Sequence, residues 1–409
     1  MAPRPGGIDR PTAPRSRMRG PAGYAVACCA IVAVGLTGCS TVGSGSDPQQ
    51  VAAPGPSAMS ITATAGAGPS AVGDASSTVG TFAALQDAVT AAAATGGGGT
   101  VTLGASVTAA YGQRLDVPIG QPVTLDLNGF NLTVTGPIQT QAAIHVRIGA
   151  SLTITDSDGP GTVTTATVGN GVAAAIGGDV GENGGAITID SGSVNATAVQ
   201  GAGIGGGYGG LSKPGGMGAT VTVNGGVVNA TSMDGGAGIG GGSGPAGGAG
   251  GVVTVTGGKV TATANNLAPR PVVGAGIGGG GGDGAGGGGG GTVTVTGGAV
   301  VATSNIGSGI GGGSGSPGGP GGTINLFGGT VVASSVNHDG AGIGGGVAAS
   351  QPGQLTLDGA STGIPVADGG AGTGAPAPAA GPRSPLTPAL EYTATASTGY
   401  FEIEFSWDR

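Results

Sequence analysis

Few side chains in this 409-residue sequence could take part in acid–base or metal chemistry. Charged residues make up 8% of the chain, and there are 2 histidines. The carboxylate pair that stands out is Asp156 and Asp158, in the segment TDSDGPG. Paired carboxylates can divide the acid and base roles of glycoside hydrolysis, but Asp beside Ser, Gly and Pro is also typical of a turn. We expect these two carboxylates to cap backbone amides in a turn.

The other ionisable residues do not form an obvious group in the sequence. They include Arg147, Lys213, Lys259, Arg270, His145 and His338. The segment Gly278–Asp283 is superficially like a Gly-rich calcium-binding repeat, but such repeats need an Asp in every unit. The equivalent loops carry Tyr208, Pro245 and Pro317 instead. We therefore expect no metal, no cofactor and no catalytic residue.

Threonine recurs at one outward position of successive predicted strands. An outward row of this kind could order water or contact a sugar, although Thr also favours solvated strand faces in general. The neighbouring positions vary (Asp190, Asn224 and Phe327), unlike the regular Thr rows of ice-binding β-helices. The row, interrupted by Asn325, is a possible binding face and consists of Thr188, Thr222, Thr254, Thr294 and Thr356.

These side chains would be positioned by a repeated unit. The phrase GAGIGGG occurs four times, with a GSGIGGG variant at 307–313 and a degenerate AAAIGGD at 173–179. A period of roughly 30–40 residues indicates one supersecondary unit stacked on copies of itself. Counting an earlier unit at IHV, we expect seven coils, each with one Ile directed into a shared core: Ile144, Ile176, Ile204, Ile239, Ile277, Ile310 and Ile343.

Each coil carries two further short strands in which apolar residues alternate with Thr or Asn. Alternation with a period of two places the apolar residues on the inside and their neighbours on the outside. Before the coils, Phe82, Leu85 and Val89 lie on one face of a predicted helix, with Thr81 as its N-cap. The sequence therefore predicts an all-β, single-stranded parallel β-helix with a short N-terminal capping helix.

The first 38 residues have the pattern of a secretion signal. Five arginines precede an apolar run from Tyr24 to Leu36, and the run is too short to span a bilayer comfortably. It ends in Leu36, Thr37, Gly38 and Cys39, which resembles the bacterial lipobox, in which the Cys is lipidated. Removal of residues 1–38 would also remove Asp9, leaving 7 basic and 19 acidic residues, a net charge of −12. So acidic a chain is a poor binder of nucleic acid.

The composition divides the chain into five parts. They are a signal peptide (1–38), a flexible tether (39–79), the β-helix (80–360), an Ala/Gly/Pro linker (361–388) and an aromatic segment (389–409). The last part alternates like a strand. We expect it to cap the final coil, with docking to a partner as the alternative.

The helix followed by GGGGTVTL, then LDLNGFNLTV and ASLTITDSDGPGTVT, resembles the right-handed parallel β-helix of the pectate-lyase-like group. The GAGIGGG units resemble those of Gly-rich bacterial surface proteins predicted to share that fold. The resemblance is specific for architecture, because this fold carries lyases, hydrolases, adhesins and passive scaffolds. A lyase of this group would need a Ca²⁺-binding carboxylate cluster beside an Arg or Lys, and a hydrolase would need Asp residues on adjacent coils. We expect neither constellation.

The prediction is therefore a non-enzymatic β-helix protein of the bacterial cell surface, anchored by a diacylglyceryl-type lipid on Cys39. It would act in adhesion, as a scaffold, or in contact with cell-wall or extracellular polysaccharide. Two alternatives stay open. One is a polysaccharide lyase or glycoside hydrolase on the same fold, and the other is ice or hydrate binding through the Thr row.

Overall fold

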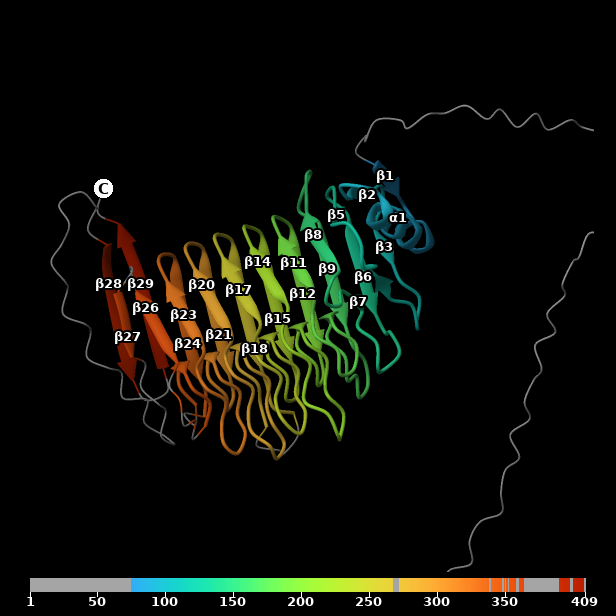
Figure 1. Cartoon of the computed structure of the whole chain (residues 1–409). Coiled ribbons are helices and arrows are strands. Elements are labelled where there is room, and N and C mark those ends of the chain that lie inside the picture. Colours follow the sequence, from blue (N-terminus) through green and yellow to red (C-terminus); the bar gives the residue numbers. More distant parts are fainter. Residues whose placement is uncertain are drawn as a thin grey trace, which may run out of the picture. The chain divides into compact units, whose positions relative to one another are not determined.

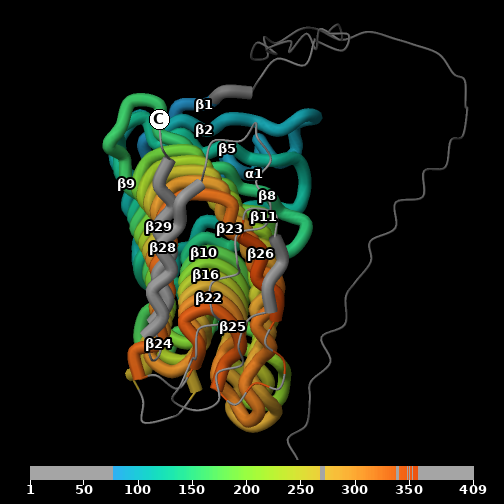
Figure 2. Tube along the Cα trace, turned by 90° about the vertical axis from the view of Figure 1, so that its left-hand side faces the viewer, coloured from blue at the N-terminus to red at the C-terminus, as the bar shows by residue number. Residues whose placement is uncertain are grey.

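The computed structural model shows a parallel β-solenoid of about seven turns, with one helix near its N-terminal end (Figure 1). It describes residues 75–267, 272–337, 340–347, 349, 351, 353–357, 360–363, 390–397 and 400–407. The predicted fold class is confirmed. Each turn contributes one strand to each of three sheets, and Figure 2 shows the successive turns stacked behind one another.

Sheet 1 holds 11 strands, parallel except for the last pair. In spatial order they are β1 (Ala75–Val79), β2 (Gly99–Leu103), β5 (Val123–Asp126), β8 (Ser151–Thr155), β11 (Ala186–Ile189), β14 (Thr220–Val223), β17 (Val252–Val255), β20 (Thr292–Val295), β23 (Thr323–Leu326), β26 (Gln354–Leu357) and β27 (Ala360–Gly363).

Sheet 2 holds 10 strands, of which the last two are antiparallel to their neighbours. They are β3 (Val107–Thr108), β6 (Asn131–Thr135), β9 (Thr162–Ala166), β12 (Ser193–Ala198), β15 (Val227–Ser232), β18 (Lys259–Ala264), β21 (Ala299–Ser304), β24 (Thr330–Ser335), β29 (Tyr400–Trp407) and β28 (Leu390–Ser397).

Sheet 3 is built from 8 two-residue strands, each beginning with a buried apolar residue. They are β4 (Leu115–Asp116), β7 (Ile144–His145), β10 (Ile176–Gly177), β13 (Ile204–Gly205), β16 (Ile239–Gly240), β19 (Ile277–Gly278), β22 (Ile310–Gly311) and β25 (Ile343–Gly344). All seven predicted Ile residues pair in register, so that prediction is confirmed. Leu115 extends the row by one strand that the repeat did not reveal.

The interior is filled unevenly along the stack. In the first coils the buried side chains are large, for example Leu125, Leu132 and Leu152. In the middle coils β14, β17 and β20 contribute pairs of Val, and β15, β18 and β21 contribute a Val and two smaller residues. Since each buried CH₂ group contributes about 0.8 kcal/mol, the N-terminal coils gain more free energy from burial than the middle ones.

The glycine loops after sheet 3 form a second packed layer that contains almost no side chains. Gly207, Gly242 and Gly280 are buried, and their peptide groups hydrogen-bond to glycines of the returning arm, Gly216 and Gly248. The bonds from Gly216 N–H to Gly207 O, from Gly248 N–H to Gly242 O and from Gly280 N–H to Gly248 O are 2.8–2.9 Å long. A Cβ atom on Gly248 would lie 2.0 Å from the carbonyl oxygen of Gly216. These loops, which lie along the lower edge in Figure 1, are therefore largely close-packed against those of neighbouring coils.

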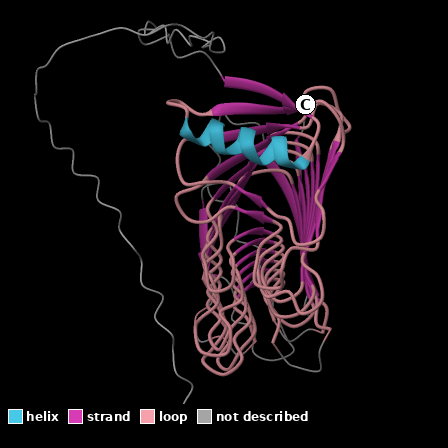
Figure 3. Cartoon of the chain, turned by 90° about the vertical axis from the view of Figure 1, so that its right-hand side faces the viewer, coloured by secondary structure: helices cyan, strands magenta, loops and turns pink. Residues whose placement is uncertain are grey.

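Helix α1 (Phe82–Ala94) lies across the N-terminal strands (Figure 3) and buries Leu85 and Val89. As predicted, the Thr81 hydroxyl accepts a hydrogen bond from the N–H of Ala84. The side-chain amide of Gln86 pairs with the backbone of β4: it donates to the Asp116 carbonyl and accepts from the Asp116 N–H, both at 2.8 Å. Gln86 thus takes the place of a further strand at the edge of sheet 3.

At the other end, β29 pairs antiparallel with β24 and so covers the edge of sheet 2. This pairing agrees with the expected cap. Two predicted boundaries were wrong, because β1 lies within the expected tether (39–79) and β27 extends past residue 360 into the expected linker. β1 was missed because ASSTV has only one large apolar residue.

Candidate functional site

A cluster of charged residues lies at the N-terminal end of sheet 3. It consists of Arg114, Asp116, His145, Asp179 and Glu182, and we call it the charged cluster. The expectation that charged residues do not converge in this chain is therefore wrong. That the protein is not an enzyme stays a prediction.

His145 is at the centre of the charged cluster and is 4% exposed. Its Nδ1 atom lies 2.5 Å from Asp116 Oδ1, and its Nε2 atom lies 2.8 Å from Glu182 Oε2. Asp179 Oδ2 is 3.8 Å from the same Nε2 atom. An ionised carboxylate can only accept a hydrogen bond. Each ring nitrogen of His145 therefore faces a carboxylate oxygen, and which nitrogen donates depends on the tautomer of the ring.

Asp179 is held in place by two other groups. Arg114 Nη1 donates to Asp179 Oδ2 at 2.6 Å, and the N–H of Ala142 donates to Asp179 Oδ1 at 2.8 Å. Arg114 Nη2 also lies 3.6 Å from Asp116 Oδ1. One guanidinium group thus links the two carboxylates on either side of His145.

The pKa of Glu182 is lowered from its usual value. Burial alone raises this pKa, but the hydrogen bond and charge of His145, the backbone amide of Asp179 and the charge of Arg147 together outweigh burial. Glu182 is therefore held in its ionised form, with a side chain that is 40% exposed. The charged cluster opens to solvent on this side.

The charged cluster arises where the repeat changes. Asp116 pairs in register with His145, and His145 pairs with Gly177 of the next coil. Every later coil also has Gly at this position. Asp179 is the last residue of the phrase AAAIGGD, at the position where the later units have Gly. Glu182 follows three residues later. Sequence reasoning missed these residues because it compared polar positions between coils on the strands of sheet 1 and not on the short strands of sheet 3. Aligning the coils position by position would have revealed them.

The predicted capping of backbone amides is confirmed for Asp156, and the second carboxylate in this role is Asp126 rather than the predicted Asp158. Asp156 accepts hydrogen bonds from the N–H groups of Gly129 and Gly161, and Asp126 accepts from the N–H groups of Asn128 and Ser157. These carboxylates stabilise two stacked turns and are committed to backbone amides.

The predicted Thr row is in register and longer than expected. Thr188, Thr222, Thr254 and Thr294 are direct neighbours on β11, β14, β17 and β20, and Asn325 separates them from Thr356. The row continues in the other direction through Thr153, Thr124 and Thr100. Seven threonines therefore form an unbroken row on the outer face of sheet 1, each half-buried.

A groove of about 450 Å³ adjoins the Thr row, and we call it the sheet 1 groove. It crosses the beginnings of four strands, and its lining includes Ile148, Ser151, Ala186, Met217, Thr220 and Val252. Three of these side chains are exposed although apolar: Ile148 by 67%, Met217 by 51% and Val252 by 44%. This volume lies within the range of ligand-binding sites.

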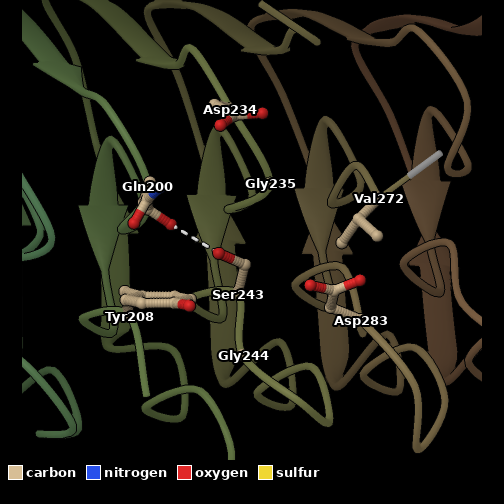
Figure 4. Close-up of a pocket in the computed structure, with 8 residues that line it drawn as sticks. All are labelled: Gln200, Tyr208, Asp234, Gly235, Ser243, Gly244, Val272 and Asp283. Atoms are coloured by element: carbon tan, nitrogen blue, oxygen red, sulfur yellow. Dashed lines mark hydrogen bonds between the residues drawn. The ribbon is translucent and has the colours of Figure 1, made fainter. Parts of the chain in front are cut away.

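A second hollow lies among the glycine loops of three coils (Figure 4). It is lined by Gln200, Tyr208, Asp234, Ser243, Val272 and Asp283, and the Ser243 hydroxyl donates to the Gln200 carbonyl at 2.9 Å. Its volume of about 20 Å³ is enough for one water molecule. This hollow is too small for a sugar or a cofactor.

The predicted lipidation site, Cys39, and the lipobox residues Leu36, Thr37 and Gly38 lie outside the described residues, as do Arg270 and His338. Among the described residues, no helix is long and apolar enough to cross a bilayer.

Four segments of the chain match the family model described as "Beta helix repeat": residues 187–208, 221–243, 253–281 and 324–347. Each match begins in a sheet 1 strand and ends just after a sheet 3 strand, so it covers most of one coil. No curated protein and no solved structure matches the chain. The comparisons therefore support the β-helix architecture.

Proposed function

We propose that this chain is a non-enzymatic β-helix protein of the bacterial cell surface, anchored through a lipid on Cys39, that binds a neutral polysaccharide along sheet 1. The observation that supports this proposal is the sheet 1 groove beside an unbroken row of threonines. A sugar chain offers both apolar ring faces and hydroxyl groups. The exposed Ile148, Met217 and Val252 suit the former, and the Thr hydroxyls suit the latter.

The charge of the protein favours a neutral ligand over an acidic one. Without residues 1–38 the chain has 7 basic and 19 acidic residues. The six groove residues named above are all uncharged, and a chain of this net charge repels polyanions. Nucleic acids and acidic polysaccharides are therefore the poorer partners.

Binding to arrayed neutral and acidic glycans tests the proposal. Met217→Asp should weaken binding to the neutral glycans at least about tenfold, because it places a charge in the apolar groove. Leu211→Asp is the matched control, since Leu211 is 89% exposed and does not line the groove. Equal binding by both variants, or a preference for acidic glycans, would contradict the proposal.

The lipid anchor has its own test. Cys39→Ala should move the protein from the membrane fraction to the soluble extracytoplasmic fraction, and a variant that stays with the membrane would refute anchoring through Cys39. Thermal hysteresis measured on the same preparation examines the ice-binding alternative, which requires a strong signal that is lost when Thr222 is replaced by a bulky residue.

The charged cluster favours one second candidate, the polysaccharide lyase or glycoside hydrolase, because three carboxylates converge beside an arginine. Release of reducing ends from the glycans that bind is the measurement. Release that is abolished by Glu182→Gln would establish the enzyme and refute the non-enzymatic proposal.

A further inference from the structure

We propose that His145, Asp179 and Glu182 bind a divalent transition-metal ion of the zinc class, with Asp116 and Arg114 as positioning residues. This inference is independent of the proposed polysaccharide binding, and it departs from the sequence-based expectation of no metal. It rests on the positions of the three ligand atoms, on the groups that hold them, and on where the repeat changes.

The ligand atoms lie at distances suited to a small ion. His145 Nε2 lies 2.8 Å from Glu182 Oε2 and 3.8 Å from Asp179 Oδ2, and all three ligand atoms lie within 4.8 Å of one another. Tetrahedral Zn²⁺ with ligand bonds of about 2.0–2.1 Å has ligand atoms about 3.3 Å apart. The two separations measured from His145 Nε2 bracket this value.

Two of the three ligands, His145 and Asp179, are oriented by further hydrogen bonds. Asp116 accepts from His145 Nδ1, which directs Nε2 toward the two carboxylates. A carboxylate on the far nitrogen of a ligating His is the usual arrangement in metal sites. Arg114 and the N–H of Ala142 hold the two oxygens of Asp179. Gln86 in turn holds the backbone of Asp116 from helix α1.

Binding of the ion would change the contacts of His145 in a defined way. Nδ1–H would donate to Asp116, while Nε2 and Glu182 would each bind the ion in place of their 2.8 Å contact. The charges of Asp179 and Glu182 would balance that of the ion, and Arg114 lies 3.6 Å from the remaining carboxylate, Asp116.

The repeat is broken at the positions that build this site. The later coils have glycine at the positions of Asp116 and His145. A Cβ atom added to such a glycine would meet the next coil; on Gly205 it would lie 2.0 Å from the Gly240 carbonyl oxygen. The equivalent glycines have a positive φ, for example +138° at Gly177 and +141° at Gly205, whereas His145 does not. Departures from a strict local rule are expected where side chains serve a function.

The donor set distinguishes between metals. One imidazole and two carboxylates suit Zn²⁺ and similar transition metals, whereas Ca²⁺ takes six to eight oxygen ligands. Glu182 is 40% exposed, so the ion can reach the site from solvent and keep a water molecule on that side.

Titration calorimetry on the full-length chain in detergent, after removal of metals with a chelator, tests the proposal with ZnCl₂, MnCl₂ and CaCl₂. We expect one Zn²⁺ per chain and much weaker binding of Ca²⁺. Glu182→Gln and His145→Gln should each weaken Zn²⁺ binding at least tenfold, and Asp116→Asn should weaken it about 10–100-fold. The control Asp87→Asn removes one exposed carboxylate from helix α1 and should change nothing.

Zinc-edge X-ray absorption should show one imidazole and otherwise oxygen ligands, and the imidazole signal should disappear in His145→Gln. Absence of stoichiometric Zn²⁺ binding, or equal affinity in the wild type and Glu182→Gln, would overturn the site. Equal affinity for Ca²⁺ would overturn the assignment of the metal. If His145→Gln fails to fold, Glu182→Gln still decides, because this half-exposed side chain changes little in shape. Unchanged affinity in Asp116→Asn would refute the positioning role of Asp116.

Discussion

Four alanine substitutions separate two reasons why this chain needs glycine, a positive φ and the lack of space for a Cβ atom. Gly96 has an ordinary backbone conformation and open space around it, and Gly210 has the same space but a φ of +74°. Gly248 has no such φ, yet its Cβ would lie 2.0 Å from a carbonyl oxygen of the neighbouring arm. Gly240 combines a φ of +142° with an approach of 1.9 Å to the Gly278 carbonyl oxygen.

The structure gives a magnitude for each substitution. Gly96→Ala should leave the free energy of unfolding almost unchanged, because Ala also restricts the unfolded chain. Gly210→Ala should lower the free energy of unfolding by about 1–2 kcal/mol, because Ala is strained in the left-handed conformation of this residue. Gly248→Ala must push the next arm away, which disrupts the 2.9 Å hydrogen bonds to Gly242 and Gly280. Two buried hydrogen bonds left unmade cost about 2–6 kcal/mol in total.

Gly240→Ala should be the most destabilising of the four, since it adds both penalties. Urea unfolding, monitored by circular dichroism, measures the four free energies of unfolding on one scale. Equal dependence of these free energies on urea concentration checks that the same structure unfolds in each variant. If Gly248→Ala is no more destabilising than Gly210→Ala, the glycines serve conformation alone. The description of the loops as a close-packed layer would then be wrong.

Three further predictions concern the core, the N-terminal edge and the charged cluster. Ile239→Ala, at a fully buried position, should destabilise the protein by about 2–5 kcal/mol in urea unfolding, and a loss below about 1 kcal/mol would contradict a shared core. Gln86→Ala should lose about 1–3 kcal/mol because it leaves the backbone of Asp116 unpaired, and unchanged hydrogen exchange at β4 would refute that role. The pKa of Glu182 is lowered in the folded state, so its ionised form contributes stability above the unfolded value of 4.5, and this contribution is lost as the pH falls through the lower folded value. The stability difference between the wild type and Glu182→Gln, measured with chelator present, should therefore shrink below pH 4.5, and a constant difference would contradict the contacts of His145.

The sequence predicted the parts of the fold that depend on side-chain periodicity. The Ile row and the flanking Val and Thr rows recur once per coil, so their register could be counted from the sequence alone. β4 was not counted as a coil, because Leu115 and Asp116 have neither the Ile nor the Gly of the repeated phrase. The glycine layer was missed for a different reason. Glycines carry no side-chain pattern, and their packing is a property of the backbone that only coordinates reveal.

The charged cluster shows a further limit of sequence reasoning. Asp116 and His145 are 29 residues apart, and Glu182 lies another 37 residues along the chain. Their proximity follows from the register of adjacent coils. The sequence indicates that register for the apolar rows and the Thr row, whereas the first two of these polar residues, Asp116 and His145, lie one position after a buried residue of sheet 3. Applying the same register to the positions after each buried residue of sheet 3 would have placed Asp116 beside His145.

The uneven filling of the interior has a consequence for the order in which the chain folds. A solenoid can nucleate in any coil and then grow coil by coil, and the coil that gains most from burial at the least entropic cost is favoured as the nucleus. The N-terminal coils hold Leu125, Leu132 and Leu152 and pack against helix α1, whereas the later coils combine small side chains with long runs of glycine. The first coils would therefore form early and act as a template on which the glycine-rich coils order one after another. Folding in that direction matches the order in which a chain leaves a ribosome or a secretion channel.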